Sequence, residues 1–246
     1  MTSKERVVLI TGGSRGIGAA MVTHFQKKGW KVATCATSQK KLEESSADFK
    51  QVCDVSKAPQ VAAFVKATFD HFSRLDAVVN NAGLAGGNSL SLEAPPEESD
   101  ELWRRIMAVN LDGTYFVCKH ALPYLPDGQG RIINIASVLA HKGVPDQTAY
   151  CAAKHGVLGF TRALSHLVAA RKITANVICP GWTRTDMAEG RMAELHITEK
   201  DFAHSVPLGR FIEPDEVAGL AYFLAASESA GGITGQSFTI DGGVLA

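Results

Sequence analysis

Residues 7–18 read Val-Val-Leu-Ile-Thr-Gly-Gly-Ser-Arg-Gly-Ile-Gly, and this stretch decides the fold. Its first residues are aliphatic and β-branched, which predicts a buried strand over residues 7–10. The glycines that follow predict a tight turn, and the apolar spacing after them predicts a helix over residues 17–28. A strand, a glycine turn and a helix in this order open a βαβ unit of a parallel sheet.

The same alternation continues along the chain. Most of the β-rich runs are continuously apolar, as expected when helices cover both faces of a parallel sheet. Further strands are predicted over residues 31–36, 50–52, 76–79, 131–136, 174–179 and 237–240, and further helices over residues 59–72, 99–122, 150–170 and 214–226. The 246 residues therefore predict a single α/β domain with seven strands. Residues 183–208 read as irregular, and we expect either a substrate lid or a surface helical excursion without a role there.

The composition argues against several classes of protein. The formal net charge is zero, so the electrostatic footprint of nucleic-acid binding is absent. We find no apolar signal region and no apolar run long enough to cross a membrane. The five cysteines lack CxxC spacing and the histidines lack ligand spacing, so no metal is expected. We expect a cytoplasmic protein with buried, reduced thiols.

The glycine turn has the form of a phosphate-binding site. Gly12 permits the turn, Gly16 lets a phosphate approach the backbone, and Gly18 lets the helix pack on the sheet. A plain β–α turn is the alternative, but the strand before it and the helix after it favour a dinucleotide site. The candidate cofactor contacts in this stretch are Gly12, Ser14, Arg15, Gly16, Ile17 and Gly18.

The residues at the end of the second strand indicate whether the cofactor is NAD(H) or NADP(H). A site that selects NAD usually places Asp or Glu there, where the carboxylate accepts hydrogen bonds from the ribose. Here residues 35–38 read Cys-Ala-Thr-Ser and contain no acid. Thr37 can donate a hydrogen bond to a 2′-phosphate, and Arg15 can reach it with a charge-assisted bond unless it is simply solvated. The pattern favours NADP(H), and NAD(H) stays open.

Four further residues suggest proton chemistry, and each has a simpler alternative. Tyr150 and Lys154 project from one face of a predicted helix, where an ammonium and an oxidised nicotinamide would lower the phenol's pKa from about 10. The two residues could also be four apart by chance. Ser137 follows the fifth strand and can either bind a substrate oxygen or cap a turn. Asn110 is polar within an apolar stretch, so it has a specific partner or is a satisfied buried amide.

Together these motifs resemble the short-chain dehydrogenase/reductase family, and the resemblance covers essentially the whole chain. It implies a doubly wound Rossmann fold, with helices on both faces of the seven-stranded parallel sheet. The matching motifs are Thr-Gly-x-x-x-Gly-x-Gly at residues 11–18, Asn-Asn-Ala-Gly at residues 80–83, Ser137, Tyr-x-x-x-Lys at residues 150–154, and Pro-Gly at residues 180–181.

The resemblance also implies roles for individual residues. Tyr150 would exchange a proton with the substrate oxygen while Ser137 polarises that oxygen. Lys154 would hold the nicotinamide ribose and tune Tyr150, and Asn110 would anchor a water that relays protons. The cofactor contacts it implies, besides Tyr150 and Lys154, are Asp54, Val55, Asn81, Ala82, Gly83, Pro180, Gly181, Thr183 and Thr185.

Within the family, the chain most resembles 3-oxoacyl-[acyl-carrier-protein] reductases and polyketide ketoreductases. The resemblance lies in residues 11–18, 36–38, 207–210 and 240–243. It implies NADPH-dependent reduction of a 3-oxoacyl thioester, carried by CoA or a carrier protein, in a homotetramer. The expected pocket wall is apolar, which suits an acyl chain or a cyclic ketone. Its residues are Leu84, Val138, Leu139, Val144, Trp182, Met187 and Met192.

Two other functions remain open. Residues 130–137 and 178–182 also resemble 3-hydroxybutyrate dehydrogenases, which favours an NAD(P)-linked dehydrogenase of a small hydroxy acid or of an alicyclic or steroid alcohol. Arg184 or Arg191 could meet a carboxylate or a phosphate of the substrate, or both could be solvated charges of the lid. The third possibility is a redox sensor that binds NADP(H) without turnover. A sensor has no need for the Tyr150 and Lys154 pair, so the sequence favours an enzyme.

Overall fold

The protein is described by a computed structural model over residues 5–85 and 96–246. These residues form one sheet of seven parallel strands in the order β3-β2-β1-β4-β5-β6-β7. The strands are β1 Val7–Thr11, β2 Lys31–Ala36, β3 Phe49–Val52, β4 Ala77–Asn80, β5 Arg131–Ile135, β6 Thr174–Pro180 and β7 Ser237–Ile240. This confirms the predicted seven-stranded parallel sheet.

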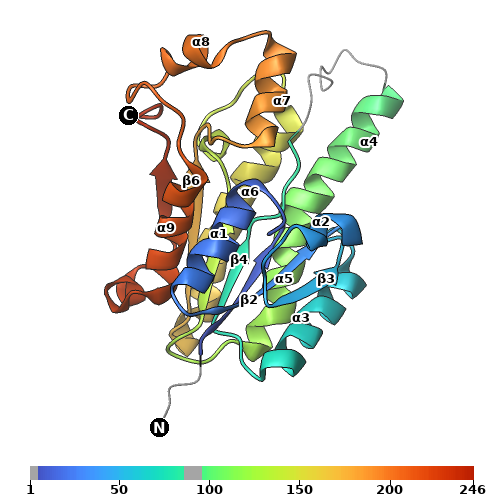
Figure 1. The fold of residues 1–246 in the computed structure, drawn as a ribbon, viewed down its shortest axis with the longest axis vertical. Coiled ribbons are helices and arrows are strands. Elements are labelled where there is room, and N and C mark those ends of the chain that lie inside the picture. Colours follow the sequence, from blue (N-terminus) through green and yellow to red (C-terminus); the bar gives the residue numbers. More distant parts are fainter. Residues whose placement is uncertain (1–4, 86–95) are drawn as a thin grey trace.

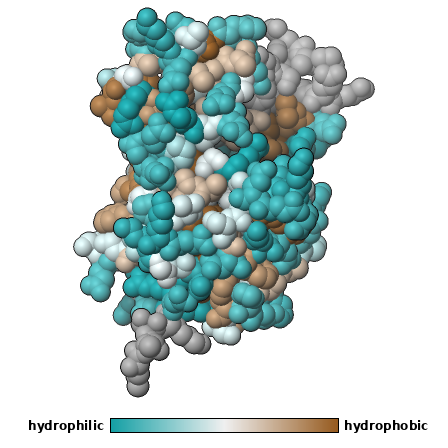
Figure 2. Space-filling view, in the orientation of Figure 1, coloured by the Kyte–Doolittle hydropathy of each residue, from teal (hydrophilic) through white to brown (hydrophobic). Residues whose placement is uncertain are grey.

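Helices cover both faces of the sheet (Figure 1). The α-helices are α1 Gly16–Lys27, α2 Gln39–Glu43, α3 Ala58–Phe72, α4 Pro96–Met107, α5 Gly113–Ala121, α6 Thr148–Val168, α7 Asp186–Leu195, α8 Glu199–Ala203 and α9 Pro214–Ala226. Short 3₁₀-helices lie at Leu122–Tyr124, Val138–Ala140, Ala169–Arg171 and Glu228–Gly232. Helices α1 and α9 bury apolar side chains on one face, and α3, α5 and α6 do so on the other. A hydrophobic core therefore lies on each face of the sheet. Hydrophilic side chains cover most of the molecular face seen in Figure 2.

Three segments differ from the sequence prediction. Helix α2 was not predicted. The helix expected over residues 99–122 is interrupted by a π-helical turn, Ala108–Asp112, between α4 and α5. The segment 183–208, expected to be irregular, contains α7 and α8. Thr185 begins α7 because its hydroxyl accepts the N–H of Ala188 at 3.3 Å. No helix among the described residues combines the length and the apolar content that a membrane crossing requires.

The strand order reverses beside β1, and this places the site. The chain adds β2 and β3 on one side of β1, and then β4 to β7 on the other. In doubly wound sheets, ligands bind at the carboxyl ends of the strands where the order reverses. The glycine turn leaves the carboxyl end of β1 there, and the other predicted site segments leave the ends of the neighbouring strands.

Candidate active site

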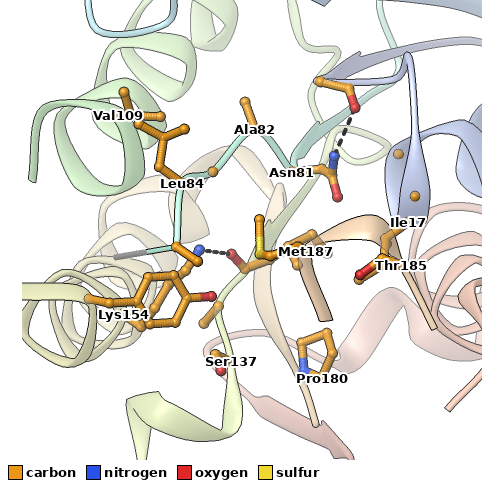
Figure 3. A pocket seen from close by; sticks show the side chains of 18 of the residues that line it. Ile17, Asn81, Ala82, Leu84, Val109, Ser137, Lys154, Pro180, Thr185 and Met187 are labelled. Atoms are coloured by element: carbon orange, nitrogen blue, oxygen red, sulfur yellow. Dashed lines mark hydrogen bonds between the residues drawn. The ribbon is translucent and has the colours of Figure 1, made fainter. Parts of the chain in front are cut away.

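The loops that leave the carboxyl ends of β1 to β6 border one cavity of about 980 Å³. That volume is at the upper end of the range for ligand pockets, as a dinucleotide with a substrate beside it would need. Every residue that the sequence analysis assigned to the cofactor borders this cavity, as do Leu84, Val138, Leu139, Val144, Trp182 and Met187. Figure 3 shows residues from distant parts of the chain around it, among them Ile17, Asn81, Lys154 and Met187.

The glycine turn is built by close packing as well as by backbone freedom. Gly12 has a φ of +70° and Gly16 a φ of +52°, values that favour glycine. A Cβ on Gly18 would lie 2.1 Å from the carbonyl oxygen of Gly12, so α1 approaches the turn too closely for any side chain. Asn81 and Ala82 brace the turn from β4, because both of their N–H groups donate to the Thr11 hydroxyl, at 3.1 and 3.0 Å.

The end of the cavity beside β2 is positively charged. Arg15, Thr37 and Lys41 all border it, and the Nζ of Lys41 lies 3.5 Å from the Thr37 hydroxyl. The sequence analysis missed Lys41, although its place four residues after Thr37 at the start of α2 was a usable signal. Arg15 also makes a long, exposed contact of 3.7 Å with Asp186 on α7. The cluster matches the dianionic charge of a 2′-phosphate.

Ser137, Tyr150 and Lys154 meet at another part of the cavity wall. Ser137 caps the short helix after it, because its hydroxyl accepts the Leu139 N–H at 3.2 Å, and it also shares a hydrogen bond with Tyr150. The Nζ of Lys154 donates to the Ile135 carbonyl at 3.0 Å and lies 5.4 Å from the centre of the Tyr150 ring. The end of β5 and the first turns of α6 thus bring a hydroxyl, a phenol and an ammonium together.

Burial dominates the pKa values of this group. Burial raises the pKa of Tyr150 to about 12, although the hydrogen bond with Ser137 acts in the opposite direction. Burial also lowers the pKa of Lys154 to about 8. At neutral pH, therefore, Tyr150 carries its proton and most Lys154 side chains are charged. A protonated phenol beside an ammonium can donate a proton to an oxygen bound next to it.

A buried chain of amides sets the position of α6 against the sheet. The Asn80 amide donates to Asn134 on β5 at 2.7 Å, and the Asn134 amide donates to Thr161 on α6 at 2.8 Å. All three side chains are buried. Because such bonds have no water to replace them, they fix the helix that carries Tyr150 relative to the strand that precedes Ser137.

Asn110 lies behind the cavity wall, in the π-helical turn, and is 1% exposed. Its side chain donates to the carbonyls of Leu84 and Ile106, at 2.9 and 3.0 Å, and accepts the Leu84 N–H at 3.3 Å. A Cβ on Gly83 would lie 2.8 Å from the Asn110 side-chain oxygen and 3.6 Å from the Nζ of Lys154. Asn110 therefore holds the segment after β4 close to Lys154.

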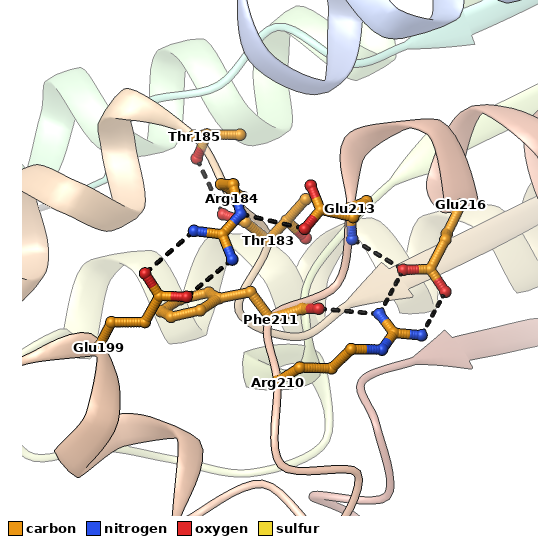
Figure 4. Close-up of polar contacts among 8 residues, drawn as sticks. All are labelled: Thr183, Arg184, Thr185, Glu199, Arg210, Phe211, Glu213 and Glu216. Carbon is orange, nitrogen blue, oxygen red and sulfur yellow. Dashed lines mark hydrogen bonds and ion pairs between the residues drawn. The ribbon is translucent and has the colours of Figure 1, made fainter.

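The substrate side of the cavity is largely apolar, and the buried cation on that side is paired. Arg191 on α7 is buried and contacts Asp146 and Glu194. Arg184 does not border the cavity; it binds Glu199 at 2.7 Å and Glu213 at 3.0 Å (Figure 4). Arg191 is therefore a buried charge and Arg184 an exposed one, and carboxylates of the chain already pair with both.

Met192 was expected in the pocket wall, but it packs with Trp182 in a small core beneath α7. Asp146 and Gln147 border the cavity and were not assigned to the pocket from the sequence, whereas Arg191, which also borders it, was considered there as a substrate contact. Within residues 5–85 and 96–246, no group of three or more His, Cys, Asp or Glu side chains is arranged to hold a metal ion.

The fold and this cavity define a dinucleotide-binding protein of the doubly wound class. Residues 12–245 match a family model described as enoyl-(acyl carrier protein) reductase. The chain belongs to the short-chain dehydrogenase/reductase family of oxidoreductases, which act on C=O and CH–OH groups.

Relatives cover the whole chain. A putative ketoacyl reductase of Streptomyces coelicolor is 36% identical, and the alignment covers 99% of this chain and 98% of that one. A 3-oxoacyl-[acyl-carrier-protein] reductase of Synechocystis is 37% identical, with coverages of 98% and 97%. Among solved structures, a variant of actinorhodin polyketide ketoreductase with NADPH superposes with a TM-score of 0.89 at 33% identity, over 99% of both chains.

Proposed function

We propose that this protein is an NADPH-dependent reductase that converts the ketone of a 3-oxoacyl thioester to a secondary alcohol. One observation carries the proposal: Ser137, Tyr150 and Lys154 border the same cavity as the cationic cluster of Arg15 and Lys41. The names of the relatives, ketoacyl reductase and 3-oxoacyl reductase, support the substrate class. The NADPH of the actinorhodin ketoreductase structure supports the cofactor.

The residues at the cavity fit NADPH. The start of α1 offers N–H groups that have no partner within the helix, and the adjacent glycines let a pyrophosphate approach them. Arg15, Thr37 and Lys41 would hold the 2′-phosphate, and Asp54 and Val55 would border the adenine. Thr183 and Thr185, which follow β6, would hold the carboxamide and the pyrophosphate. Lys154 would hold the nicotinamide ribose. When bound, the reduced cofactor supplies the hydride.

The chain's own residues supply the proton and its control. Tyr150 would donate its phenolic proton to the ketone oxygen, and Ser137 would donate a hydrogen bond to the same oxygen. The positive charge of Lys154 would stabilise the phenolate that Tyr150 leaves behind. Asn110 would act by positioning, because it fixes the segment next to Lys154 and would anchor a water that returns the proton.

The substrate wall favours a neutral ketone over a free acid. Val138, Leu139, Val144, Trp182 and Met187 present apolar surface, and Arg191 is matched by two carboxylates. A free 3-oxo acid would bury its own carboxylate against this apolar wall, which is costly, because the buried cation there, Arg191, is already paired. Three further cations that border the cavity, Arg104, Arg105 and Lys142, are exposed. Arg171, whose charge could attract an acidic carrier protein, is held by Asp127 at 2.6 Å. We therefore choose the CoA thioester for the first test.

The test compares oxidation of NADPH and NADH with acetoacetyl-CoA, followed by absorbance, with free acetoacetate as the matched control. We expect rapid NADPH oxidation with the thioester, at least about tenfold slower oxidation with NADH, and little with the free acid. Turnover of acetoacetate with NADH would instead indicate a hydroxy-acid dehydrogenase. Binding of NADPH without turnover of the thioester or of a panel of cyclic ketones would indicate a sensor.

We also propose two features of the assembly. Trp103, Tyr115 and Leu167, on α4, α5 and α6, are 42%, 43% and 72% exposed. Large apolar side chains on one set of helices favour contact between copies of the chain, and a homotetramer is measurable by light scattering. The segment 183–208 would act as the substrate lid, since Met187 and Arg191 on α7 form part of the cavity wall.

A further inference from the structure

Two cysteines lie together beside the adenosine end of the cavity. Cys35 is in β2 and Cys53 directly follows β3. In the parallel pairing Cys35 lies opposite Gln51, so Cys53, two residues further, lies on the same face of the sheet. The two residues are 1% and 2% exposed in the same core, and both border the cavity. The cavity is therefore the route by which a small molecule reaches them.

The two thiols differ in acidity because of their contact. They share a hydrogen bond, which is the largest influence on the pKa of each. That bond lowers the pKa of Cys53, whereas the same bond and burial raise the pKa of Cys35. In contrast, burial raises the pKa of Cys118 to about 12. Thiolates rather than thiols react with oxidants, so Cys53 is the nucleophile of the pair and Cys35 is its neighbouring thiol.

Backbone bonds connect the pair to the nucleotide-binding segments. The Gly12 N–H donates to the Cys35 carbonyl at 3.0 Å, and the Cys53 N–H donates to the Ala36 carbonyl at 2.9 Å. Thr37 follows two residues after Cys35, and Asp54 follows Cys53 directly. Any movement of the two sulfur atoms toward each other therefore acts on the residues that border the adenosine end of the cavity.

We propose that Cys35 and Cys53 are a thiol pair that hydrogen peroxide oxidises to a disulfide, and that this disulfide impairs nucleotide binding. The Cys53 thiolate attacks one peroxide oxygen, the O–O bond breaks, and protonation of the departing hydroxide gives water and a sulfenic acid on Cys53. The Cys35 sulfur then attacks that sulfur, the S–O bond breaks, an S–S bond forms, and a second water leaves. Two thiols are oxidised to one disulfide and one peroxide is reduced to two waters.

The disulfide would change the site through its geometry. Two sulfur atoms that share a hydrogen bond must close to a bond length of about 2.05 Å. The closure draws β2 and the start of the β3–α3 loop together beneath Thr37 and Asp54. A bound nucleotide fills the cavity through which peroxide arrives, so it protects the pair. This protection rests on the proposed NADPH site.

The experiment treats the whole protein with stoichiometric hydrogen peroxide, with and without saturating NADPH, and then alkylates the free thiols. After tryptic digestion the two cysteines fall in separate peptides, residues 32–40 and 51–57. We expect mass spectrometry to find these two peptides joined in the protein without nucleotide and separate in the NADPH sample. We expect the NADPH dissociation constant, measured by fluorescence, to rise at least about tenfold after oxidation and to recover with dithiothreitol.

Variants separate this pair from the other thiols. Cys53→Ala should keep its own untreated NADPH affinity after peroxide, whereas Cys118→Ala should lose affinity as the wild type does. Absence of the joined peptides in nucleotide-free protein would overturn the proposal, and so would a joined species that binds NADPH as tightly as the reduced protein. Equal cross-linking with saturating NADPH would overturn the protection. Failure of the reduced protein to bind NADPH would instead count against the proposed function.

Discussion

Lys154 shows how a residue of the proposed site can lower the stability of the protein. It is 4% exposed, and burial lowers its pKa from 10.5 to about 8. Between these two values the unfolded chain binds more protons than the folded one, so stability rises with pH across that window. Below pH 8 the folded protein bears the full cost of burying the charge. Each unit of pKa shift corresponds to about 1.4 kcal/mol, so the upper limit is roughly 3 kcal/mol.

Replacing this ammonium with an apolar side chain should therefore stabilise the protein at neutral pH. We expect Lys154→Met to raise the free energy of unfolding at pH 7 by about 1–3 kcal/mol, reduced by the loss of the hydrogen bond to Ile135. Most of this gain should disappear by pH 10, where the wild-type Lys154 is neutral in the folded protein. Urea denaturation at both pH values measures it. The exposed Lys200→Met is the control, with an expected change within about 0.5 kcal/mol. A Lys154→Met protein less stable than the wild type at pH 7 would contradict the burial argument.

Thr37 is the residue at which cofactor choice can be reversed. It lies at the end of β2 with Lys41 3.5 Å from its hydroxyl. A carboxylate here would repel a 2′-phosphate and accept hydrogen bonds from the free ribose hydroxyls of NADH. The proposed preference for NADPH thus depends on the absence of a negative charge at position 37.

We expect Thr37→Asp to lower the ratio of kcat/KM for NADPH to that for NADH by at least about 100-fold, measured by initial rates. Thr37→Asn has nearly the same shape without the charge and should change the ratio by less than about tenfold. If the two variants behave alike, the 2′-phosphate does not lie beside Thr37.

At the scale of elements, the junction of β1 and α1 has the least room for a larger side chain. A Cβ on Gly18 would lie 2.1 Å from the Gly12 carbonyl and 2.6 Å from the Asn81 side chain. We expect Gly18→Ala to cost about 2–4 kcal/mol of stability and to raise the NADPH dissociation constant at least about tenfold. Thermal unfolding and fluorescence titration measure the two effects.

Gly190, within α7, is the matched control because a Cβ there would meet nothing within 4 Å. Gly190→Ala should stabilise α7 by up to about 1 kcal/mol, since alanine favours the helix. If Gly18→Ala is as stable as Gly190→Ala, the turn can relax and the packing argument fails.

Most elements could be predicted because their hydrophobic pattern is strong and local. The strands over residues 31–36 and 237–240 were predicted with the observed bounds. The π-helical turn at Ala108–Asp112 was missed because its apolar residues fit a regular helix equally well. The bounds of α7 and α8 could not be predicted because residues 183–208 mix charged residues, glycine and methionine without a clear period.

At the scale of the whole molecule, the motif residues of the candidate site could be predicted from the sequence, but the residues that contact them from other elements could not. The motif residues follow strand ends, and a parallel sheet brings its carboxyl ends to one edge, so their convergence was predictable. Lys41 looks like a solvated charge in the sequence, and Arg191 could be either a substrate contact or a solvated charge. Only the packing of α2 and α7 places both at the cavity. The contact of Cys35 with Cys53 depends on the register of β2 and β3, which no motif encodes.

The whole account depends on Tyr150 as the proton donor within an NADPH-dependent reductase, and one variant tests it. NADPH oxidation with acetoacetyl-CoA should fall at least about 1,000-fold in Tyr150→Phe, while the NADPH dissociation constant stays within about threefold of wild type. Tyr124→Phe, whose ring stacks on Phe69 away from the cavity, should keep its activity. A Tyr150→Phe protein that retains more than about a tenth of wild-type activity would contradict the mechanism.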